Sequence, residues 1–340
     1  MTTDFRVKVV ETKSDWDTLL SCCKNVNLLQ TWEYGEAKHR TEGWSPMRIA
    51  IFHLEKPVAV VQVLIKKIPV LGGIARINRG PLIISSDHNF YSGMLLELLN
   101  FLYKHWVKNQ KMILFIAPNC QNDEVGEADL RKLGYNPIDK EPWSSILIDL
   151  SLAERILRRN LHQKWRNLLN KAERAGLKLE IAEDEGFSFL MDKYTQMMID
   201  KNFSGISVNL LKELRNVTEN KLNTQVLFAV KNNIRVSGIL VFGYFDTCHY
   251  LVGWNSDEGR VLCANYFLIW QAILLFKKIG FHWFDLGGIS ERSTPGITRF
   301  KRRTGGREYR LIGEFEAYPD SILSNMLKKY VGLLRRYRGK

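Results

Sequence analysis

The sequence predicts an α+β protein made of two copies of one module, because the same order of elements occurs twice along its 340 residues. In the first half, strands are expected at 47–52 and 58–66, a helix at 90–108 and a buried strand at 112–117. In the second half, strands are expected at 225–230, 234–244 and 249–253, a helix at 263–279 and a strand at 282–286. The offset between the two series is roughly 170–180 residues throughout, which indicates an internal repeat.

Turn residues mark the hairpins of both copies. Leu54-Glu-Lys-Pro57 separates the first two strands, and Lys231-Asn-Asn233 separates the strands at 225–230 and 234–244. Asparagine tolerates the left-handed backbone that a tight turn requires. Both segments therefore predict antiparallel pairs at matching places in the two copies.

A basic amphipathic helix is expected between the copies, from 152 to 175. Ser151 and Glu154 have the spacing of a capping box, and Gly176 suits the position after a helix end. Apolar residues fall on one face at helical spacing. The remaining positions carry seven cations: Arg155, Arg158, Arg159, Lys164, Arg166, Lys171 and Arg174. This surface is either a binding face for an anion or the solvated side of an ordinary helix.

Composition limits the partners and the compartment. The formal net charge is +13 and the pI is about 9.4, which favours a nucleic acid, a phosphorylated small molecule or an anionic membrane. Five irregularly spaced cysteines and no paired histidine ligands predict a reduced, cytoplasmic protein without disulfides or a metal site. We expect neither a signal peptide nor a transmembrane helix, because the required apolar runs are absent.

Familiar cofactor and nucleophile motifs are absent. The chain has no Walker A sequence, no G-x-G-x-x-G and no G-x-S-x-G. The acidic group at 123–129 is expected to be solvated surface. No sequence-reading nucleic-acid motif occurs, so any bound RNA should be held through its backbone.

The most informative segment runs from the strand at 282–286 to residue 306. Gly287 and Gly288 follow the strand, and glycine lets another molecule approach the backbone closely. A polar loop is expected next. Its five cations are Arg292, Arg299, Lys301, Arg302 and Arg303. Such a loop suits an anionic ligand or a developing oxyanion, although a turn with a solvated basic face has the same composition.

The last fifteen residues, 326–340, carry six cations, no acid and an apolar stripe. This pattern fits an amphipathic helix on an anionic membrane surface. It fits equally a tail that packs on the first domain.

Three segments together resemble the Fem-type non-ribosomal aminoacyl transferases (FemA, FemB and FemX). The first is Leu29-Gln-Thr-Trp32-Glu-Tyr-Gly-Glu-Ala-Lys38 with Gly43-Trp44 behind it. The second is Asn78-Arg79-Gly80-Pro81, followed by the basic helix. The third runs from Ala264-Asn265-Tyr266 through Asp285-Leu-Gly-Gly-Ile289 to Phe300-Lys301.

The resemblance implies two tandem acetyltransferase-like (GNAT-like) domains with mixed sheets and no coiled-coil arm. The first domain would be 1–150, joined by the C-terminal segment 315–340, and the second would be 151–314 with the catalytic loop. It also implies transfer of an amino acid from aminoacyl-tRNA to an amine, usually on the stem peptide of a peptidoglycan precursor. No cofactor is needed beyond the aminoacyl-tRNA co-substrate.

The resemblance also assigns roles to residues. Lys301, with Phe300, would be catalytic, and Lys301 would stabilise the carbonyl oxygen electrostatically. Lys38 would hold the phosphates of the precursor. The other expected substrate contacts are Trp32, Tyr250, Gly287, Gly288 and Arg299, with a place in the core as the alternative for Tyr250. The expected tRNA contacts are Arg158, Arg159, Arg166, Arg302 and Arg303.

One departure and two alternatives stay open. Residues 203–209 lack the phosphate-binding arginine and the tyrosine of FemX-like enzymes, which argues against a UDP-linked acceptor and is compatible with a lipid-linked one at the inner face of the membrane. The first alternative is an acyl-CoA-dependent N-acyltransferase acting on an amino sugar or polysaccharide precursor, although its Gln/Arg-x-x-Gly-x-Gly/Ala loop is missing. The second is a silent membrane-surface or RNA-binding protein that kept the fold.

Overall fold

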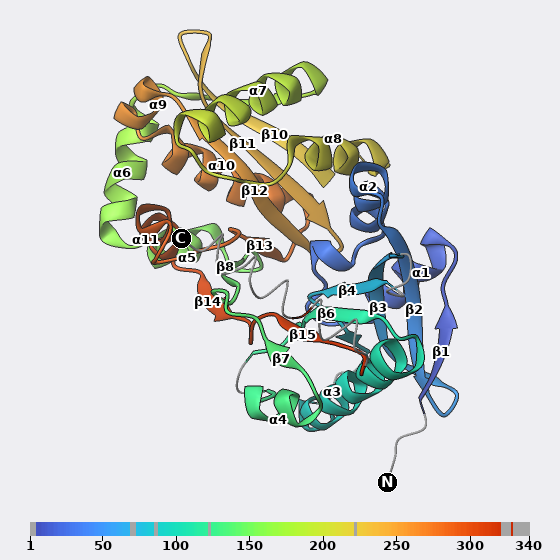
Figure 1. The fold of residues 1–340 in the computed structure, drawn as a ribbon. Helices are drawn as coiled ribbons and strands as arrows, with labels where there is room; N and C mark the ends of the chain where they lie inside the picture. Colours follow the sequence, from blue (N-terminus) through green and yellow to red (C-terminus); the bar gives the residue numbers. More distant parts are fainter. Residues whose placement is uncertain are drawn as a thin grey trace. The chain divides into compact units, whose positions relative to one another are not determined.

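The computed structural model describes residues 5–68, 73–84, 88–121, 124–220, 223–320 and Lys328. It divides into two compact units. Unit 1 comprises Met1–Trp143 and Arg310–Lys340, and unit 2 comprises Ser144–Tyr309. Each unit has one mixed sheet with helices packed on it (Figure 1).

The sheet of unit 1 has the order β1-β2-β3-β4-β6-β15-β7, with β5 on β3. Its strands are β1 (Phe5–Val9), β2 (Ser45–His53), β3 (Lys56–Lys66), β4 (Ile74–Asn78), β5 (Leu82–Ile83), β6 (Ile113–Ala117), β7 (Asn136–Pro137) and β15 (Phe315–Ala317). Its helices are α1 (Lys13–Ser21), the 3₁₀ turn η1 (Leu28–Gln30), α2 (Trp32–Glu42), α3 (His88–Tyr103), the π-helical turn η2 (Lys104–Asn109) and α4 (Glu127–Lys132). The pair β4–β6 is parallel, and the other pairs described for this sheet are antiparallel.

Two apolar clusters hold unit 1 together. On one side, Leu98, Leu99 and Leu102 of α3 pack against Val61 and Ile77 of the sheet. Their i, i+1, i+4 spacing gives α3 an apolar stripe that the strands cover. A smaller cluster brings α1 onto the sheet through residues Trp16, Leu20, Val60 and Leu82.

The sheet of unit 2 has the order β14-β8-β13-β12-β11-β10-β9. Its strands are β8 (Ser144–Asp149), β9 (Lys178–Ala182), β10 (Thr224–Lys231), β11 (Ile234–Tyr244), β12 (Thr247–Asn255), β13 (Trp283–Asp285) and β14 (Arg307–Arg310). Its helices are α5 (Glu154–Asn160), α6 (Gln163–Arg174), α7 (Asp184–Asp200), α8 (Val208–Val217), α9 (Asp257–Val261), α10 (Ala264–Ile279) and α11 (Pro295–Arg302). The pair β12–β13 is parallel.

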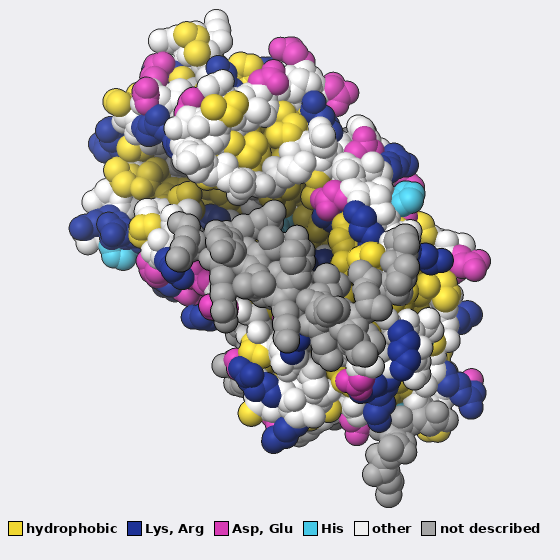
Figure 2. Space-filling view, viewed as in Figure 1, with side chains coloured by type: hydrophobic (Ala, Val, Ile, Leu, Met, Phe, Trp, Pro, Cys, Tyr) yellow, Lys and Arg dark blue, Asp and Glu magenta, His cyan; other side chains and the backbone are white. Residues whose placement is uncertain are grey.

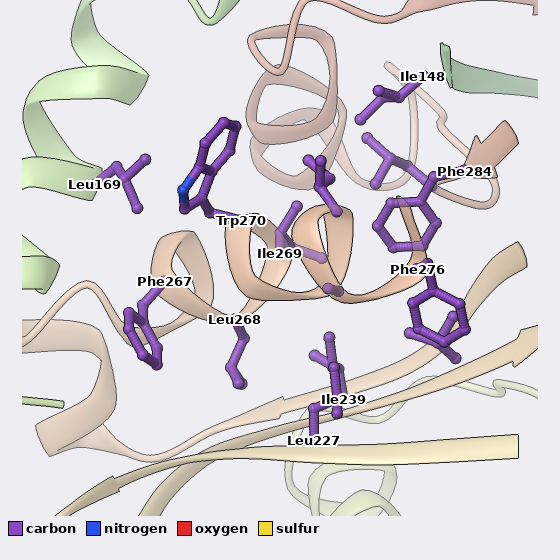
Figure 3. Packing of buried hydrophobic residues seen from close by; sticks show 14 of the residues in the cluster. Ile148, Leu169, Leu227, Ile239, Phe267, Leu268, Ile269, Trp270, Phe276 and Phe284 are labelled. Carbon is purple, nitrogen blue, oxygen red and sulfur yellow. The ribbon is translucent and has the colours of Figure 1, made fainter. Parts of the chain in front are cut away.

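Helix α10 forms the centre of unit 2. Figure 3 shows Leu268 directed toward Leu227 and Ile239 of the sheet, and Trp270 directed toward Leu169 of α6. The helix is apolar on most of its circumference because it lies between the strands and α6. Phe276 continues the packing onto Phe284 of β13, with ring centroids 6.1 Å apart.

The two sheets confirm the predicted repeat. The series β9-β10-β11-β12-β13-β8 of unit 2 follows the series β1-β2-β3-β4-β6-β15 of unit 1, and each contains one parallel pair at the same place. The strand beside β6 comes from the end of the chain, whereas the strand beside β13 comes from the middle.

The pairing of β8 with β13 corrects the predicted domain boundaries. Strand β8 was expected in domain 1 (1–150), but it completes the second sheet, where Asp149 pairs with Trp283 and Leu147 with Asp285. Unit 2 therefore begins at Ser144 and ends at Tyr309, and residues 310–314 belong to unit 1 rather than to the predicted 151–314 domain. Strand β15 places the start of the expected C-terminal segment in the first sheet.

The helix predicted at 152–175 is wrong as a single element. Leu161 and His162 have ψ angles of 134° and 144°, so the chain is extended between α5 and α6. The imidazole of His162 accepts a hydrogen bond from the amide of Lys164 and caps α6. Ser151 is not the cap of α5, because its hydroxyl donates to Asp149 and Ala153 precedes the helix. Gly176 has the expected left-handed φ of 68°.

The loop expected after β13 is also partly helical, since α11 covers residues 295–302. Pro295 occupies the first turn, where its missing N–H costs nothing. The expected amphipathic segment 326–340 lies almost entirely outside the described residues, so both of its interpretations stay predictions. In the described part of the chain, no helix has the length and apolar character needed to cross a bilayer.

Candidate active site

Lys301 is the centre of a polar site in unit 2. It lies in the last turn of α11 with only 6% of its surface exposed. Its ammonium donates a hydrogen bond to the carbonyl oxygen of Gly288 at 2.9 Å and lies 5.4 Å from the centre of the Tyr250 ring. Within the described part of the chain, no carboxylate lies within 4.0 Å of this ammonium. The fold therefore buries a cation against a carbonyl and an aromatic face.

Burial lowers the pKa of Lys301 to about 8, and the nearby Asp285 carboxylate opposes that shift. The reason is that a buried site disfavours the charged form of the amine. With a pKa of about 8, most of the ammonium remains protonated at pH 7, by roughly ten to one. The site thus holds a mostly charged lysine that loses its proton far more readily than a solvated one.

The Asp285 carboxylate contacts residues from four segments of unit 2. Its carboxylate accepts hydrogen bonds from the Gly287 amide at 2.8 Å, the Tyr309 hydroxyl at 2.8 Å and the Ser145 hydroxyl. The Nδ1 atom of His249 lies 3.8 Å from the same carboxylate. These partners come from the turn after β13 and from β14, β8 and β12. One buried carboxylate therefore fixes the backbone beside Lys301.

The turn at Gly287 requires glycine for two reasons. Its φ of 74° lies in the left-handed region, and a Cβ there would be 2.8 Å from the Tyr250 carbonyl oxygen and 3.6 Å from the Lys301 ammonium. The missing side chain keeps the space beside the ammonium open.

Tyr250 owes its placement to a β-bulge. The register between β11 and β12 shifts so that Leu240 faces Val252 and Val241 faces Tyr250. The Tyr250 hydroxyl lies over Gly253, where a Cβ would be only 1.8 Å away. Burial raises the pKa of Tyr250 to about 12, so the phenol stays protonated and can donate a hydrogen bond.

Phe300 has a different place from the one its predicted catalytic role suggests. Its ring lies 5.0 Å from Tyr266 and 5.9 Å from Trp165, centroid to centroid. These rings belong to α10 and α6. We therefore reassign Phe300 as the side chain that anchors α11, while the next residue carries the ammonium.

Comparison with known proteins finds similarity in sequence and in fold. A model of the FemAB family matches residues 207–329. The chain is 23% identical over 425 residues to the lipid II:glycine glycyltransferase of Staphylococcus haemolyticus, covering 97% of this chain and 99% of that protein. The crystal structure of FemX matches with a TM-score of 0.77 at 18% identity, covering 95% of this chain and 99% of the other.

The chain is thus similar to Fem-type proteins in sequence and in fold. A second solved structure, a tandem GNAT protein from the clavulanic acid biosynthesis pathway, matches with a TM-score of 0.53 at 12% identity, over 93% of this chain and 98% of that one. The predicted fold of two tandem GNAT-like domains is confirmed.

The tRNA contacts expected from the sequence separate into two groups. Arg158 binds both oxygens of Glu173 at 2.8 and 2.7 Å and joins α5 to α6. Arg302 binds Glu308 at 2.6 and 2.8 Å and also pairs with Glu291. Arg166 donates to the carbonyl oxygens of Arg159 and Leu161 where α5 ends. These three guanidinium groups therefore bind other parts of the protein and stabilise the fold.

Other cations of unit 2 are available to a ligand. Arg159 is exposed, Arg303 is half-buried, and neither pairs with a carboxylate among the described residues. Four further exposed cations also pair with no carboxylate among the described residues: Arg155, Lys164, Lys171 and Arg299. The carbonyl of Arg303 accepts the His162 amide at 2.9 Å, so α11 ends against the α5–α6 junction. In Figure 2, Lys and Arg side chains lie along the edge of unit 2 that α6 and α11 occupy in Figure 1.

The two residues expected to bind substrate in unit 1 both have partners. The Lys38 ammonium pairs with Glu42 one helical turn later. The Trp32 ring is covered by the guanidinium of Arg48, whose Cζ lies 3.5 Å from the ring centre. Neither contact excludes a ligand. However, Glu42 offsets the charge of Lys38, and Arg48 covers one face of the Trp32 ring, so each side chain binds a ligand less strongly than a free one would.

The sequence did not single out Asp285, Ser145, His249 or Tyr309 as site residues. Asp285 stands inside the quoted Asp-Leu-Gly-Gly segment, and an acid two residues before a glycine pair was the available signal. Ser145 and Tyr309 are distant in sequence, so only the pairing of β8 and β14 in the second sheet brings them to this carboxylate.

Proposed function

We propose that this chain moves glycine from glycyl-tRNA to an amine of a lipid-linked peptidoglycan precursor and so forms an amide. The names of its relatives support glycine and lipid II, and the unpaired cations of unit 2 support an RNA-borne donor. The observation that carries the proposal is the buried Lys301 ammonium, held by the Gly288 carbonyl beside a turn without side chains.

The reaction requires no external energy source. The acceptor nitrogen attacks the ester carbonyl, a C–N bond forms, and the carbonyl oxygen takes up negative charge. The C–O bond to the ribose then breaks, and the proton of the amine passes to the departing ribose oxygen. An ester becomes an amide, so the catalyst chiefly has to orient the amine and stabilise the oxyanion.

Lys301 supplies that stabilisation in this account. A charge already fixed in a dry site needs no reorganisation when the oxyanion develops, which makes it more effective than a solvated lysine. The Gly287–Gly288 turn admits the aminoacyl ester, and Tyr250 offers a protonated hydroxyl next to the ammonium. Asp285 positions the turn and helps keep Lys301 charged.

The RNA backbone would lie on the unpaired cations of α5, α6 and α11. Lys164 and Lys171 are seven residues apart on α6, so they share a face of that helix. Arg155 and Arg159 are four residues apart on α5 and therefore also share a face of their helix. Because α11 ends at the α5–α6 junction, this surface leads to the helix that carries Lys301.

Donor competition tests the proposal. Purified protein receives a lipid II acceptor and one of three donors: radiolabelled glycyl-tRNA, free glycine with ATP, or acetyl-CoA. We expect transfer from glycyl-tRNA only, and prior RNase treatment should abolish it. Transfer from acetyl-CoA with none from glycyl-tRNA would establish the acyl-CoA alternative instead.

A further inference from the structure

The imidazole of His249 approaches the same point in the Gly287 turn as the Lys301 ammonium. A Cβ placed at Gly287 would lie 3.3 Å from the Nε2 atom of His249 and 3.6 Å from the Lys301 nitrogen. The histidine is buried, with 8% of its side chain exposed, and it comes from β12, whereas the lysine comes from α11. Two nitrogens from different elements therefore meet where glycine leaves out a side chain.

The other ring nitrogen of His249 faces a carboxylate. Its Nδ1 atom lies 3.8 Å from Asp285, which is longer than a hydrogen bond but close enough for electrostatic attraction. The negative charge favours a proton on Nδ1, so the Nε2 atom near Gly287 is left with its lone pair. The same carboxylate stabilises the ring when it takes up a second proton.

The internal repeat shows that the fold does not require this pair. In unit 2, the last residues paired between the parallel strands β12 and β13 are His249 and Asp285. In unit 1, the last residues paired between the corresponding parallel strands β4 and β6 are Asn78 and Ala117. Neither asparagine nor alanine exchanges protons near neutral pH. A titratable pair at this position in the copy that holds Lys301 indicates a chemical role rather than a structural one.

The other titratable groups beside the turn suit other roles. Burial raises the pKa of Tyr250 to about 12, so the phenol keeps its proton. Burial also raises the pKa of the Cys248 thiol well above its usual value. The Asp285 carboxylate already accepts hydrogen bonds from three groups, and Lys301 acts through its positive charge. Histidine, by contrast, is the side chain best suited to accept and return a proton near neutral pH.

We propose that His249 carries the proton of the acceptor amine to the departing ribose oxygen. When the amine attacks the ester carbonyl, the new C–N bond leaves a positive charge on the nitrogen, and Nε2 takes up one of its protons. The imidazolium returns this proton to the ribose oxygen as the C–O bond breaks. His249 ends neutral, and the products are an amide and a free hydroxyl. The inference rests on the proposed function for its donor and acceptor.

Nitrogen NMR of full-length protein labelled in its histidine rings tests the tautomer without any substrate. The signals of His249 are those lost in His249→Asn, which has the residue found at the corresponding place in unit 1. We expect the neutral ring to carry its proton on Nδ1 in the wild type, and to shift toward Nε2 in Asp285→Asn. A wild-type ring protonated mainly on Nε2 would overturn the proposal. The wild-type spectrum decides if Asp285→Asn does not fold.

Single-turnover glycyl transfer tests the proton transfer itself. His249→Ala should slow the reaction by about 10²-fold or more. The matched control is His282→Ala, which removes an exposed histidine next to β13 and should keep the wild-type rate. Added imidazole should restore much of the rate of His249→Ala, because it can occupy the vacated space and carry protons. Pyrazole, a ring of nearly the same size but a much weaker base, should not.

Three results with His249→Ala would each overturn the proposal: a wild-type rate, restoration by pyrazole as well as by imidazole, or no restoration by imidazole. If this variant does not fold, His249→Gln takes its place, since glutamine has polar atoms of similar reach but carries no proton near neutral pH. A wild-type rate in His249→Gln would then overturn the proposal. A wild-type protein that transfers no glycine counts against the proposed function, and the tautomer measurement then decides this inference.

Discussion

The Lys301 ammonium donates a hydrogen bond to the carbonyl oxygen of Gly288 across 2.9 Å. This bond joins the last turn of α11 to the turn after β13. Two more hydrogen bonds connect the same segments. The Thr298 hydroxyl donates to the Ser290 carbonyl oxygen at 2.9 Å, and the Ser290 amide donates to the Thr298 hydroxyl at 3.0 Å. The position of the ammonium is therefore set by backbone on both sides of the loop.

The transfer rate should fall as the pH rises through about 8. The ammonium form of Lys301 is the active form, and its pKa is lowered to about 8 by burial. Below that pH the rate should rise with pH, because the acceptor amine must lose its own proton before it attacks. The measurement is the pH profile of kcat. Lys301→Arg should lose the high-pH fall, since guanidinium stays charged; a fall near pH 8 that persists in this variant would contradict the assignment.

Asp285→Asn should move the high-pH fall to lower pH. The Asp285 carboxylate raises the pKa of Lys301 against the effect of burial, so its loss lets that pKa drop further. The pH profiles of Asp285→Asn and Tyr309→Phe make the comparison. Tyr309→Phe removes one hydrogen bond to the same carboxylate but keeps the charge, and its profile should match the wild type. Equal shifts in both variants would indicate a purely structural role.

Charge reversal should separate the two groups of cations in unit 2. Arg159→Glu with Lys164→Glu should weaken tRNA binding and reduce its salt dependence while the melting temperature stays close to that of the wild type. Arg158→Glu should lower the melting temperature, because it places a carboxylate against Glu173. Filter binding at several salt concentrations, together with thermal melts, checks both. An Arg159/Lys164 variant that binds tRNA normally would remove α5 and α6 from the interface.

Lys301→Met should stabilise the fold. The lowered pKa means that the buried ammonium costs up to about 3 kcal/mol relative to the unfolded chain, and methionine removes that cost. Wild-type stability should accordingly rise as the pH increases from about 8 toward 10.5, because the unfolded lysine then holds more protons than the folded one. Thermal melts at pH 7 should show a gain of a few degrees. Lys277→Met, which loses a bond to the Leu150 carbonyl at 2.7 Å, should show no gain.

Local patterns predicted the strands, the hairpins and the repeat, since each depends on neighbours in sequence. The asparagines at 232 and 233 have φ angles of 50° and 63°, as the hairpin turn requires. The sequence could not show that β8 joins the second sheet, because that pairing depends on the open edge of β13, more than 130 residues away. The break at Leu161 and His162 was hidden for a similar reason, since it is held by α11 through the Arg303 carbonyl.

The candidate site was predicted only in part. Paired glycines and a motif lysine marked Gly287, Gly288 and Lys301, all of which the structure brings together. Charge alone, however, could not distinguish Arg158 and Arg302, which are paired with glutamates, from Arg159 and Arg303, which are not. That distinction depends on Glu173, Glu291 and Glu308, whose positions only the fold determines.

The most direct test of the account is single-turnover glycyl transfer from glycyl-tRNA by Lys301→Met and Lys277→Met, compared with the wild type. Both lysines donate to a backbone carbonyl, but only Lys301 lies beside the open turn. Loss of one oxyanion stabiliser lowers the chemical rate by about 10²–10³-fold. We predict that loss for Lys301→Met, with tRNA binding intact, and a nearly normal rate for Lys277→Met. A Lys301→Met rate close to that of the wild type would contradict the central claim that this buried ammonium drives the transfer.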